Sequence, residues 1–269
     1  MIDLLYALLL GIIEGITEFL PISSTGHLIV SQRLLGFHDY KDLFAVVIQV
    51  GAIAAVIWYY REDLWEKTLG LFHRKRSAMN FWKILVIGTL PAGIIGLIFD
   101  KISNSLTTPL VVAIALIVGG IILWLVDNKP VRSTAEADLS RITLKQAVLI
   151  GFGQCVAMIP GVSRSGATIV SGLAVKLNRP TATAFSFYLS IPVLIMASIY
   201  KLAKYHSEIP HITGGYAGIA VGLVAAFLTA LFAVSWLLRY IAHHNFKPFA
   251  IYRVVAGCVI LALVGVGWL

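Results

Sequence analysis

Long apolar runs, separated by short polar segments, dominate the chain. A helix needs about 20 mostly apolar residues to cross the roughly 30 Å hydrocarbon core of a bilayer. Six runs are of about this length: residues 43–60, 81–99, 109–126, 185–200, 216–238 and 249–269. The pattern predicts an all-α polytopic membrane protein with six transmembrane helices.

Two further apolar segments, residues 4–30 and 147–170, are broken near their middles. Both are long enough to cross a bilayer, but Pro, Gly and hydroxyl residues interrupt them. Proline ends a helix, and irregular backbone at membrane depth is tolerated only where protein or water surrounds it. We therefore expect both segments to form re-entrant helix-loop-helix hairpins.

The two broken segments match each other at an offset of 140 residues, and the later spans continue the match with shifts of one residue. This predicts a single membrane domain, residues 1–269, built from an internal repeat of residues 1–128 and 141–269. Each half would hold one hairpin and three crossings, and an odd number of crossings makes the repeat inverted. The matched hairpin pairs are Gly11 with Gly151, Ser23 with Ser163, Gly26 with Gly166, Ile29 with Ile169 and Val30 with Val170.

The composition excludes the soluble classes of protein. Hydrophobic residues make up 59% of the chain and charged residues 13%, whereas about 45–50% of an average soluble domain is apolar. A disulfide scaffold is excluded because the chain has two cysteines, Cys155 and Cys258, which we expect to be free. The net charge of +8 does not indicate nucleic-acid binding, because the basic residues lie in the loops between apolar spans. Residues 1–10 contain no basic n-region, so no cleavable signal peptide is expected.

The basic residues predict the orientation. In the six-span topology one side holds 14 Lys and Arg and the other side holds 5. The positive-inside rule makes the richer side cytoplasmic, which places both termini outside. The first hairpin then enters from the outer face and the second from the cytoplasm. The poorer side holds Arg33, Lys41, Lys101, Lys201 and Lys204.

Two carboxylates lie within the first hairpin. Glu14 and Glu18 are four residues apart, so on a helix they share one face, one turn from each other. Ionisable groups at this depth persist where they pair, line water or carry out chemistry. The pair could hold a divalent cation together with phosphate oxygens, since Mg²⁺ favours that ligand set. Alternatively, protonation or Arg253 could neutralise it in a structural role.

The loop of the first hairpin has the composition of an anion site. Pro21 ends the rising helix, and the segment PISSTGH follows. Backbone amides and the positive end of the dipole at a helix start bind phosphate, although hydroxyl groups at this depth could merely satisfy backbone groups. The candidate phosphate-binding residues are Ser23, Ser24, Thr25 and Gly26, and His27 opens the next helix.

The second hairpin repeats this pattern with an arginine added. Arg164 has no acidic neighbour in the sequence, and a buried guanidinium favours a bidentate oxyanion such as phosphate. Pairing with Glu14 or Glu18 is the structural alternative. If the two hairpins meet at mid-membrane, their residues together are suited to phosphoryl chemistry. The candidate phosphate-binding residues here are Ser163, Ser165, Gly166 and Thr168, beside Arg164.

Other polar positions carry weaker signals. Gln49 and Gln154 lie in apolar segments, where hydrogen bonding between helices is favoured over a supporting role at the site. The histidines other than His27 lie in loops without metal-ligand spacing. No Walker loop, GxGxxG or CxxC motif is present, so nucleotide-driven and redox chemistry have no support.

Three motifs make the chain similar to the undecaprenyl-diphosphate phosphatase family, also called the bacitracin-resistance family. They are EGITEFLPISSTGH at residues 14–27, PGVSRSGAT at 160–168 and PFAIYR at 248–253, and the resemblance runs essentially end to end. It implies a multi-pass hydrolase of the bacterial inner membrane. Such an enzyme converts undecaprenyl diphosphate to undecaprenyl phosphate and inorganic phosphate, recycling the lipid carrier for peptidoglycan synthesis. It also implies bacitracin resistance, a site open to the periplasm, and membrane lipids and a homodimer as partners.

The resemblance also implies roles for individual residues. Glu18, Ser24, His27 and Arg164 would be catalytic, and Glu14 would help Glu18 to bind a divalent cation, Mg²⁺ or Ca²⁺. Ser24 is the favoured nucleophile, with His27 or Glu18 as its base, and if Ser24 opens a helix it should face the same side as His27. Direct attack by water stays open. A transporter of polyprenyl phosphate lipids is the alternative function, because inverted repeats with broken helices are typical of carriers.

Overall fold

The protein is helical throughout the described residues. The computed structural model describes residues 1–127 and 137–269, and within 97–105 only the backbone. The predicted repeat boundary at residue 128, the basic residues Lys129 and Arg132 and the side chain of Lys101 therefore lie outside the described part. The helices are α1 (Ile2–Thr17), α2 (Ser24–Leu35), α3 (Leu43–Tyr59), α4 (Arg61–Phe72), α5 (Arg76–Leu106), α6 (Pro109–Val126), α7 (Leu144–Cys155), α8 (Arg164–Ala174), α9 (Arg179–Tyr205), α10 (Gly215–His243) and α11 (Lys247–Gly265), with 3-10 turns at Leu139–Arg141, Val156–Met158 and His206–His211.

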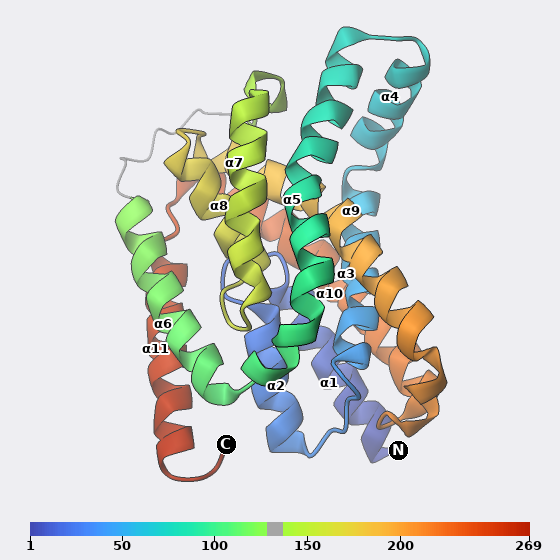
Figure 1. Ribbon diagram of the computed structural model, residues 1–269, viewed down its shortest axis with the longest axis vertical. Helices are drawn as coiled ribbons and strands as arrows, with labels where there is room; N and C mark the ends of the chain where they lie inside the picture. Colours follow the sequence, from blue (N-terminus) through green and yellow to red (C-terminus); the bar gives the residue numbers. More distant parts are fainter. Residues whose placement is uncertain (128–136) are drawn as a thin grey trace.

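The predicted all-α membrane class is confirmed. Among the described residues, five helices are long and apolar enough to cross a bilayer: α5, α6, α9, α10 and α11. A sixth span results if α3 and α4 count together, but they bend by 74° at Tyr60. The helix α4 was missed by the sequence analysis, because its charged residues interrupt the apolar pattern. It packs against the start of α5, and together they project from one end of the molecule (Figure 1).

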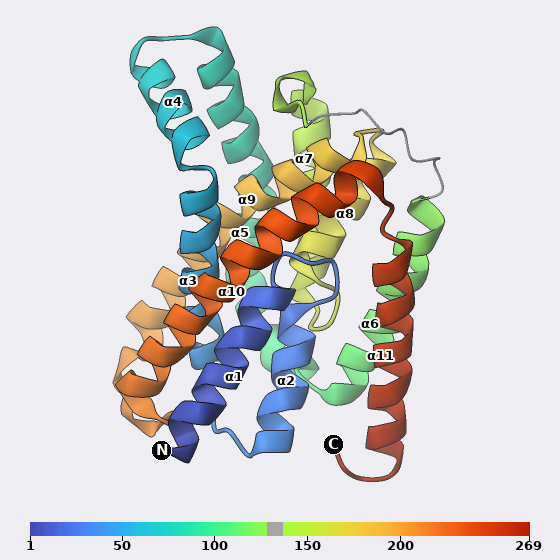
Figure 2. The same ribbon diagram turned by 180° about the vertical axis from the view of Figure 1, so that it is seen from behind.

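Both predicted hairpins form, and they enter from opposite ends. The helix α1 starts from the end that carries both chain termini and α2 returns to it, whereas α7 starts from the other end and α8 returns there (Figures 1 and 2). Long helices surround them, with α10 packed against α1 and α3, and α6 packed against α11 and α8. The loops of the two hairpins meet in the middle of the molecule. The superposition of the two halves as an inverted repeat stays a prediction.

A buried arginine joins the two hairpin loops. Arg253 of α11 is 1% exposed, and its guanidinium donates to the carbonyls of Pro21 at 3.2 Å and Val162 at 2.9 Å. It also donates to carbonyls of Ala115 and Gly161. Carbonyls freed by broken helices must find donors at membrane depth. The alternative that Arg253 neutralises the glutamate pair is therefore wrong, because it binds backbone carbonyls.

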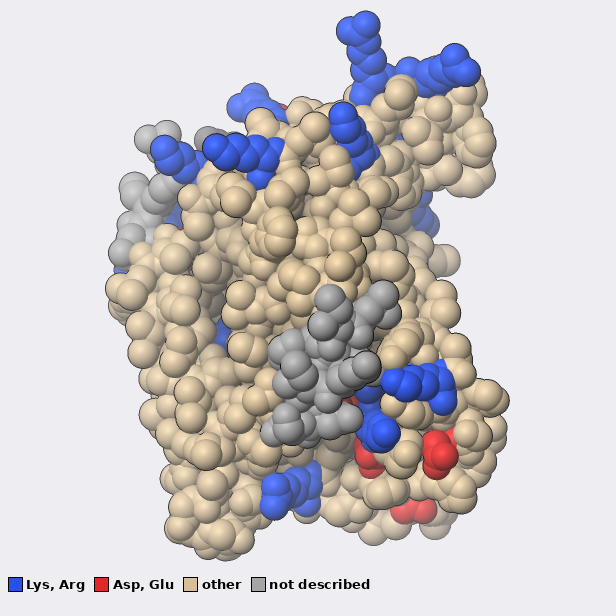
Figure 3. All heavy atoms as spheres, viewed as in Figure 1, with Lys and Arg blue, Asp and Glu red and all other residues tan. Residues whose placement is uncertain are grey.

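The charge distribution agrees with the predicted excess of basic residues on one side of the protein. Basic side chains gather at the end that carries α4 and the start of α7, and acidic side chains are visible near the opposite end (Figure 3). The termini lie at that opposite end (Figure 1). Both cysteines are free, as expected.

Candidate functional site

Each hairpin loop ends in the same strained turn. Ser23 caps α2 with a φ of 73°, and Ser163 caps α8 with a φ of 74°. A positive φ costs energy in residues other than glycine and persists only where surrounding structure holds it. The cap hydroxyls accept from the amides of Gly26 at 3.3 Å and Gly166 at 3.0 Å. The two serines form one pair and the two glycines another when the halves of the sequence are aligned at an offset of 140 residues.

The two glycines allow close packing between helices. A Cβ on Gly26 would lie 3.0 Å from Val112 of α6, and one on Gly166 would lie 2.8 Å from the Arg253 guanidinium. Neither glycine lines the cavity described below. Other helices occupy the space beside these glycines, and their contact with an anion stays a prediction.

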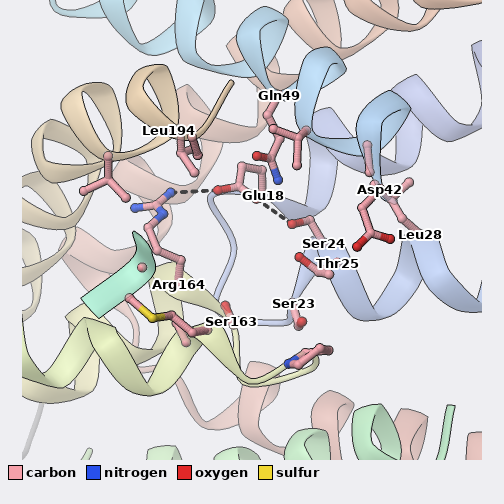
Figure 4. Close-up of a pocket in the computed structure, with 18 of the residues that line it drawn as sticks. Glu18, Ser23, Ser24, Thr25, Leu28, Asp42, Gln49, Ser163, Arg164 and Leu194 are labelled. Atoms are coloured by element: carbon pink, nitrogen blue, oxygen red, sulfur yellow. Dashed lines mark hydrogen bonds and ion pairs between the residues drawn. The ribbon is translucent and has the colours of Figure 1, made fainter. Parts of the chain in front are cut away.

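One carboxylate joins the two hairpins at the centre of the site. Glu18 follows the last turn of α1, and its Oε2 accepts from Ser24 Oγ at 2.5 Å. Its other oxygen, Oε1, accepts from Arg164 Nη2 at 3.0 Å. Figure 4 shows all three side chains converging, Glu18 from the loop after α1, Ser24 from α2 and Arg164 from α8. The structural alternative for Arg164, a pair with Glu18, is thus realised. Because the same carboxylate holds the Ser24 hydroxyl, it is placed to accept the proton of that hydroxyl.

Arg164 has two further features that leave it able to bind an anion. Its Nη1 donates to the carbonyl of Ser186 on α9 at 2.9 Å. Its Nε is buried and has no hydrogen-bond partner in the described residues. A guanidinium with an unused donor, held on two sides, is a preorganised binding group for an oxyanion.

A network of hydroxyl groups on α8 and α9 lies beside Arg164. Thr168 donates to Ser186 Oγ at 2.6 Å, and Ser165 donates to the carbonyl of Leu20 at 2.8 Å, which ties the two hairpins together. Neither Ser165 nor Thr168 lines the cavity. Ser186 was not predicted as a site residue, although a serine in an apolar span is itself a signal for a polar partner.

A cavity of about 420 Å³ adjoins these residues. Among the residues expected at the site, it brings together Glu18, Ser23, Ser24, Thr25, Ser163 and Arg164. The remaining wall is mostly apolar and includes Val46 of α3, Ala92 of α5 and Leu194 of α9. The first turns of α2 and α8 both contribute lining, so two positive helix ends lie at the polar side. The cavity thus suits a molecule with an anionic group and an apolar body.

His27 lies outside this cavity. Its Nδ1 lies 2.7 Å from the carbonyl of Ser23, and its Nε2 lies 2.7 Å from the hydroxyl of Tyr252 on α11. A carbonyl only accepts, so Nδ1 carries the proton and in the neutral ring Nε2 accepts from Tyr252. The expectation that His27 faces the same side as Ser24 is therefore not met. Glu18, and not His27, contacts the Ser24 hydroxyl.

Glu14 is buried beside the site. It is 0% exposed, and neither carboxylate oxygen has a partner in the described residues. Glu18, Gln49 and Arg164 are the polar groups around it. Gln154 instead donates to the carbonyl of Gly88 at 2.9 Å, the interhelical bond favoured above.

The carboxylates alone do not complete a metal site. Over the described ranges, no group of three or more His, Cys, Asp or Glu side chains could hold a metal ion. The unpartnered carboxylate of Glu14, one turn before Glu18, nevertheless fits a cation whose remaining ligands are oxygens of a bound phosphate or water.

Comparison with known proteins gives consistent results over nearly the whole chain. The family model described as bacitracin resistance protein BacA matches residues 7–259. An undecaprenyl-diphosphatase 3 of Acinetobacter baylyi is 45% identical over 263 residues, covering 97% of each chain. An undecaprenyl-diphosphatase of Deinococcus radiodurans is 45% identical over 98% of this chain and 97% of its own. Undecaprenyl-diphosphatase 1 of Burkholderia thailandensis is 46% identical over 98% of this chain and 96% of its own.

Proposed function

The chain belongs to the bacitracin resistance protein BacA family, and from this premise we propose that it is an undecaprenyl-diphosphatase. It hydrolyses undecaprenyl diphosphate to undecaprenyl phosphate and inorganic phosphate, returning the carrier to peptidoglycan synthesis and conferring bacitracin resistance. The observation that carries the proposal is the Glu18 carboxylate, which bridges a serine hydroxyl and an arginine inside a cavity with apolar walls. The diphosphate binds at the polar side, and the isoprenoid chain extends along the apolar side.

The reaction follows from these positions. Ser24 Oγ attacks the terminal phosphorus while Glu18 accepts its proton. The bond between this phosphorus and the bridging oxygen breaks, and undecaprenyl phosphate leaves with the electron pair. Arg164 and the two helix starts stabilise the charge on the transferred group. Glu18 passes its proton to the departing phosphate oxygen and can then deprotonate a water molecule, which attacks the phosphoserine. The bond between phosphorus and Ser24 Oγ breaks, Ser24 takes the proton back from Glu18, and inorganic phosphate is released.

The ion pair between Glu18 and Arg164 makes the serine's activation depend on substrate. While Arg164 holds Oε1, part of the charge of the carboxylate is compensated. Phosphate oxygens that bind Arg164 compete for the guanidinium, which leaves the carboxylate free to take the proton of Ser24. Direct attack by water uses the same groups, with Ser24 then only orienting the phosphate.

One assay distinguishes the proposed hydrolase from a transporter. Purified protein in detergent should release inorganic phosphate from a polyprenyl diphosphate. Two hairpins that enter from opposite ends are also an arrangement found in carriers. Flux of lipid phosphate in sealed vesicles without any phosphate release would therefore replace the enzyme by a transporter.

We also propose that Glu14 and Glu18 hold a divalent cation, Mg²⁺ or Ca²⁺, together with the diphosphate. When bound, the cation would offset negative charge on the phosphate oxygens. Chelation should abolish phosphate release. Glu14→Gln should raise the metal concentration needed for half-maximal rate, because one negative ligand is lost. Unchanged metal dependence in this variant would leave Glu14 as a structural residue.

The contact between His27 and Tyr252 leads to a prediction with a smaller expected effect. Tyr252→Phe removes the hydroxyl that donates to His27 Nε2, and a neutral hydrogen bond contributes about 1 kcal/mol. Because the other ring nitrogen of His27 binds the carbonyl of Ser23, the cap next to Ser24 should become less ordered. We expect kcat to fall several-fold with little change in KM. A loss as large as that of His27→Ala would instead indicate that Tyr252 takes part in the reaction.

The protein is an integral membrane protein, and we propose the bacterial inner membrane, a periplasmic opening of the site and a homodimer. The later part of α2, which holds Ser31, and the first turn of α5, which holds Ser77, lie near opposite ends of the molecule (Figure 1). In a cysteine-free background, Ser31→Cys should react with a membrane-impermeant thiol reagent added outside intact cells, and Ser77→Cys should not. The reverse pattern would invert the topology and the side of access. A crosslinked dimer in native membranes would support the homodimer.

A further inference from the structure

Three lysines converge on one tyrosine ring at the end of the molecule that has few basic residues. The ammonium nitrogens of Lys41, Lys201 and Lys204 lie 5.0, 5.8 and 5.2 Å from the ring centroid of Tyr205. These are three of the five basic residues that the sequence places on this side. Like charges repel, so such a cluster is most stable when an anion lies between its members.

The cluster is continuous with the cavity that holds Glu18, Ser24 and Arg164. Lys201 and its neighbour Tyr200 line that cavity. Hydrogen bonds fix the cluster, since Lys201 Nζ donates to the carbonyl of Lys41 at 2.7 Å and Lys204 Nζ donates to the hydroxyl of Tyr200 at 2.8 Å. An ammonium has three donors, and the bond to Lys41 uses one donor of Lys201.

A strained turn before α3 carries Lys41 and contributes Asp42 to the wall of the cavity. Lys41 and Asp42 have φ values of 50° and 59°. Asp42 stands at the N-cap position of α3 but makes no capping bond, because Asp39 accepts from the amides of Phe44 and Ala45 instead. The Asp42 carboxylate lines the cavity, on the side of Ser24 and Thr25 (Figure 4). Burial raises the pKa of Asp42, and the nearby Lys201 ammonium offsets part of this rise.

We propose that Lys201, supported by Lys41 and Lys204, forms a second phosphate-binding subsite at the mouth of the cavity, separate from Arg164. This inference rests on the proposed function and extends it. The ligand is a phosphate group in passage between water and the reacting residues, either free inorganic phosphate or the head of a lipid diphosphate.

The lysine side chains suit the passage of a phosphate group better than its tight binding. Lysine offers a mobile point charge, whereas arginine offers a rigid bidentate fork. A phosphate that binds Lys201 is attracted from solution by the three lysines and is then transferred to the more strongly preorganised Arg164, or leaves by the same route after hydrolysis. Asp42, which lines the cavity near Lys201, reduces the positive charge of the three lysines without cancelling it.

The test compares three variants in detergent at constant ionic strength. Lys201→Gln removes the charge, Lys201→Arg keeps it, and Arg33→Gln removes a charge from the same side at a residue that does not line the cavity. The first measurement needs no turnover and follows the rise in apparent Tm with inorganic phosphate. The second measures the Ki of inorganic phosphate and the KM for a polyprenyl diphosphate.

Lys201→Gln should raise the phosphate concentration for half-maximal stabilisation about tenfold, the effect of losing one charge-assisted contact. Lys201→Arg and Arg33→Gln should stay near wild type. A raised Ki alone identifies the ligand as free phosphate, and a raised KM alone identifies it as the lipid head. The inference is overturned if Lys201→Gln changes none of these quantities, or if Arg33→Gln changes them equally. Failure of the proposed function would give a different result: wild-type protein would be stabilised by inorganic phosphate but would release no phosphate from a polyprenyl diphosphate.

Discussion

Glu18→Gln is expected to reduce kcat for phosphate release by about 10³-fold or more, within the upper part of the range for loss of a general base. The amide keeps the size of the side chain but cannot accept the proton of Ser24, which the carboxylate contacts at 2.5 Å. It also removes the negative partner of Arg164. Steady-state release of inorganic phosphate from a polyprenyl diphosphate measures the effect.

A matched control separates this effect from a general loss of charge. Glu62→Gln makes the same change on α4, where the side chain is exposed and pairs with Arg61, so it should leave turnover near wild type. If His27 rather than Glu18 were the base, His27→Gln would cause the larger loss and Glu18→Gln would retain substantial turnover. That result would require His27 to turn away from Tyr252 when substrate binds.

Arg164→Lys should lower kcat by about 10²- to 10³-fold, the usual cost of removing one stabiliser of transition-state charge. Lysine keeps the charge but cannot bind Glu18, Ser186 and a phosphate oxygen with one rigid group. Arginine and lysine differ little in their cost of membrane insertion, so the variant should still fold. Phosphate release, compared with apparent Tm and elution volume in detergent, measures both properties.

The control for this variant is Arg239→Lys. Arg239 lies on α10, is exposed and does not line the cavity, so its replacement should change neither kcat nor apparent Tm. Near-wild-type turnover of Arg164→Lys would remove Arg164 from the phosphate site and leave it as the structural partner of Glu18.

The helical hairpins were predictable because local chemistry determines them. Pro21 and Pro160 interrupt apolar segments that are otherwise long enough to cross a bilayer, and serine caps start the next helices at Ser24 and Arg164. Proline, glycine and hydroxyl residues act on the backbone within a few positions. No distant contact is needed to predict such breaks, and the family motifs overlap them.

The helix α4 was not predictable from hydropathy, because its amphipathic sequence is stabilised by packing. Five charged residues among its twelve suggest a loop, yet it packs against α5, and Asp63 accepts a hydrogen bond from Tyr188 of α9 at 2.6 Å. Most helical stability comes from such tertiary contacts rather than from propensity.

The sequence by itself determined the all-α membrane class, the positions of both hairpins and the residues of their loops, since hydrophobic length and helix-breaking residues act locally. Only the tertiary structure decided that Glu18 joins Ser24 to Arg164, that His27 faces Tyr252, and that Arg253 binds carbonyls rather than carboxylates. Each of these outcomes except the contact of Glu18 with Ser24 involves partners more than 90 residues apart. They depend on the rotation of one helix against another, which a local pattern does not specify.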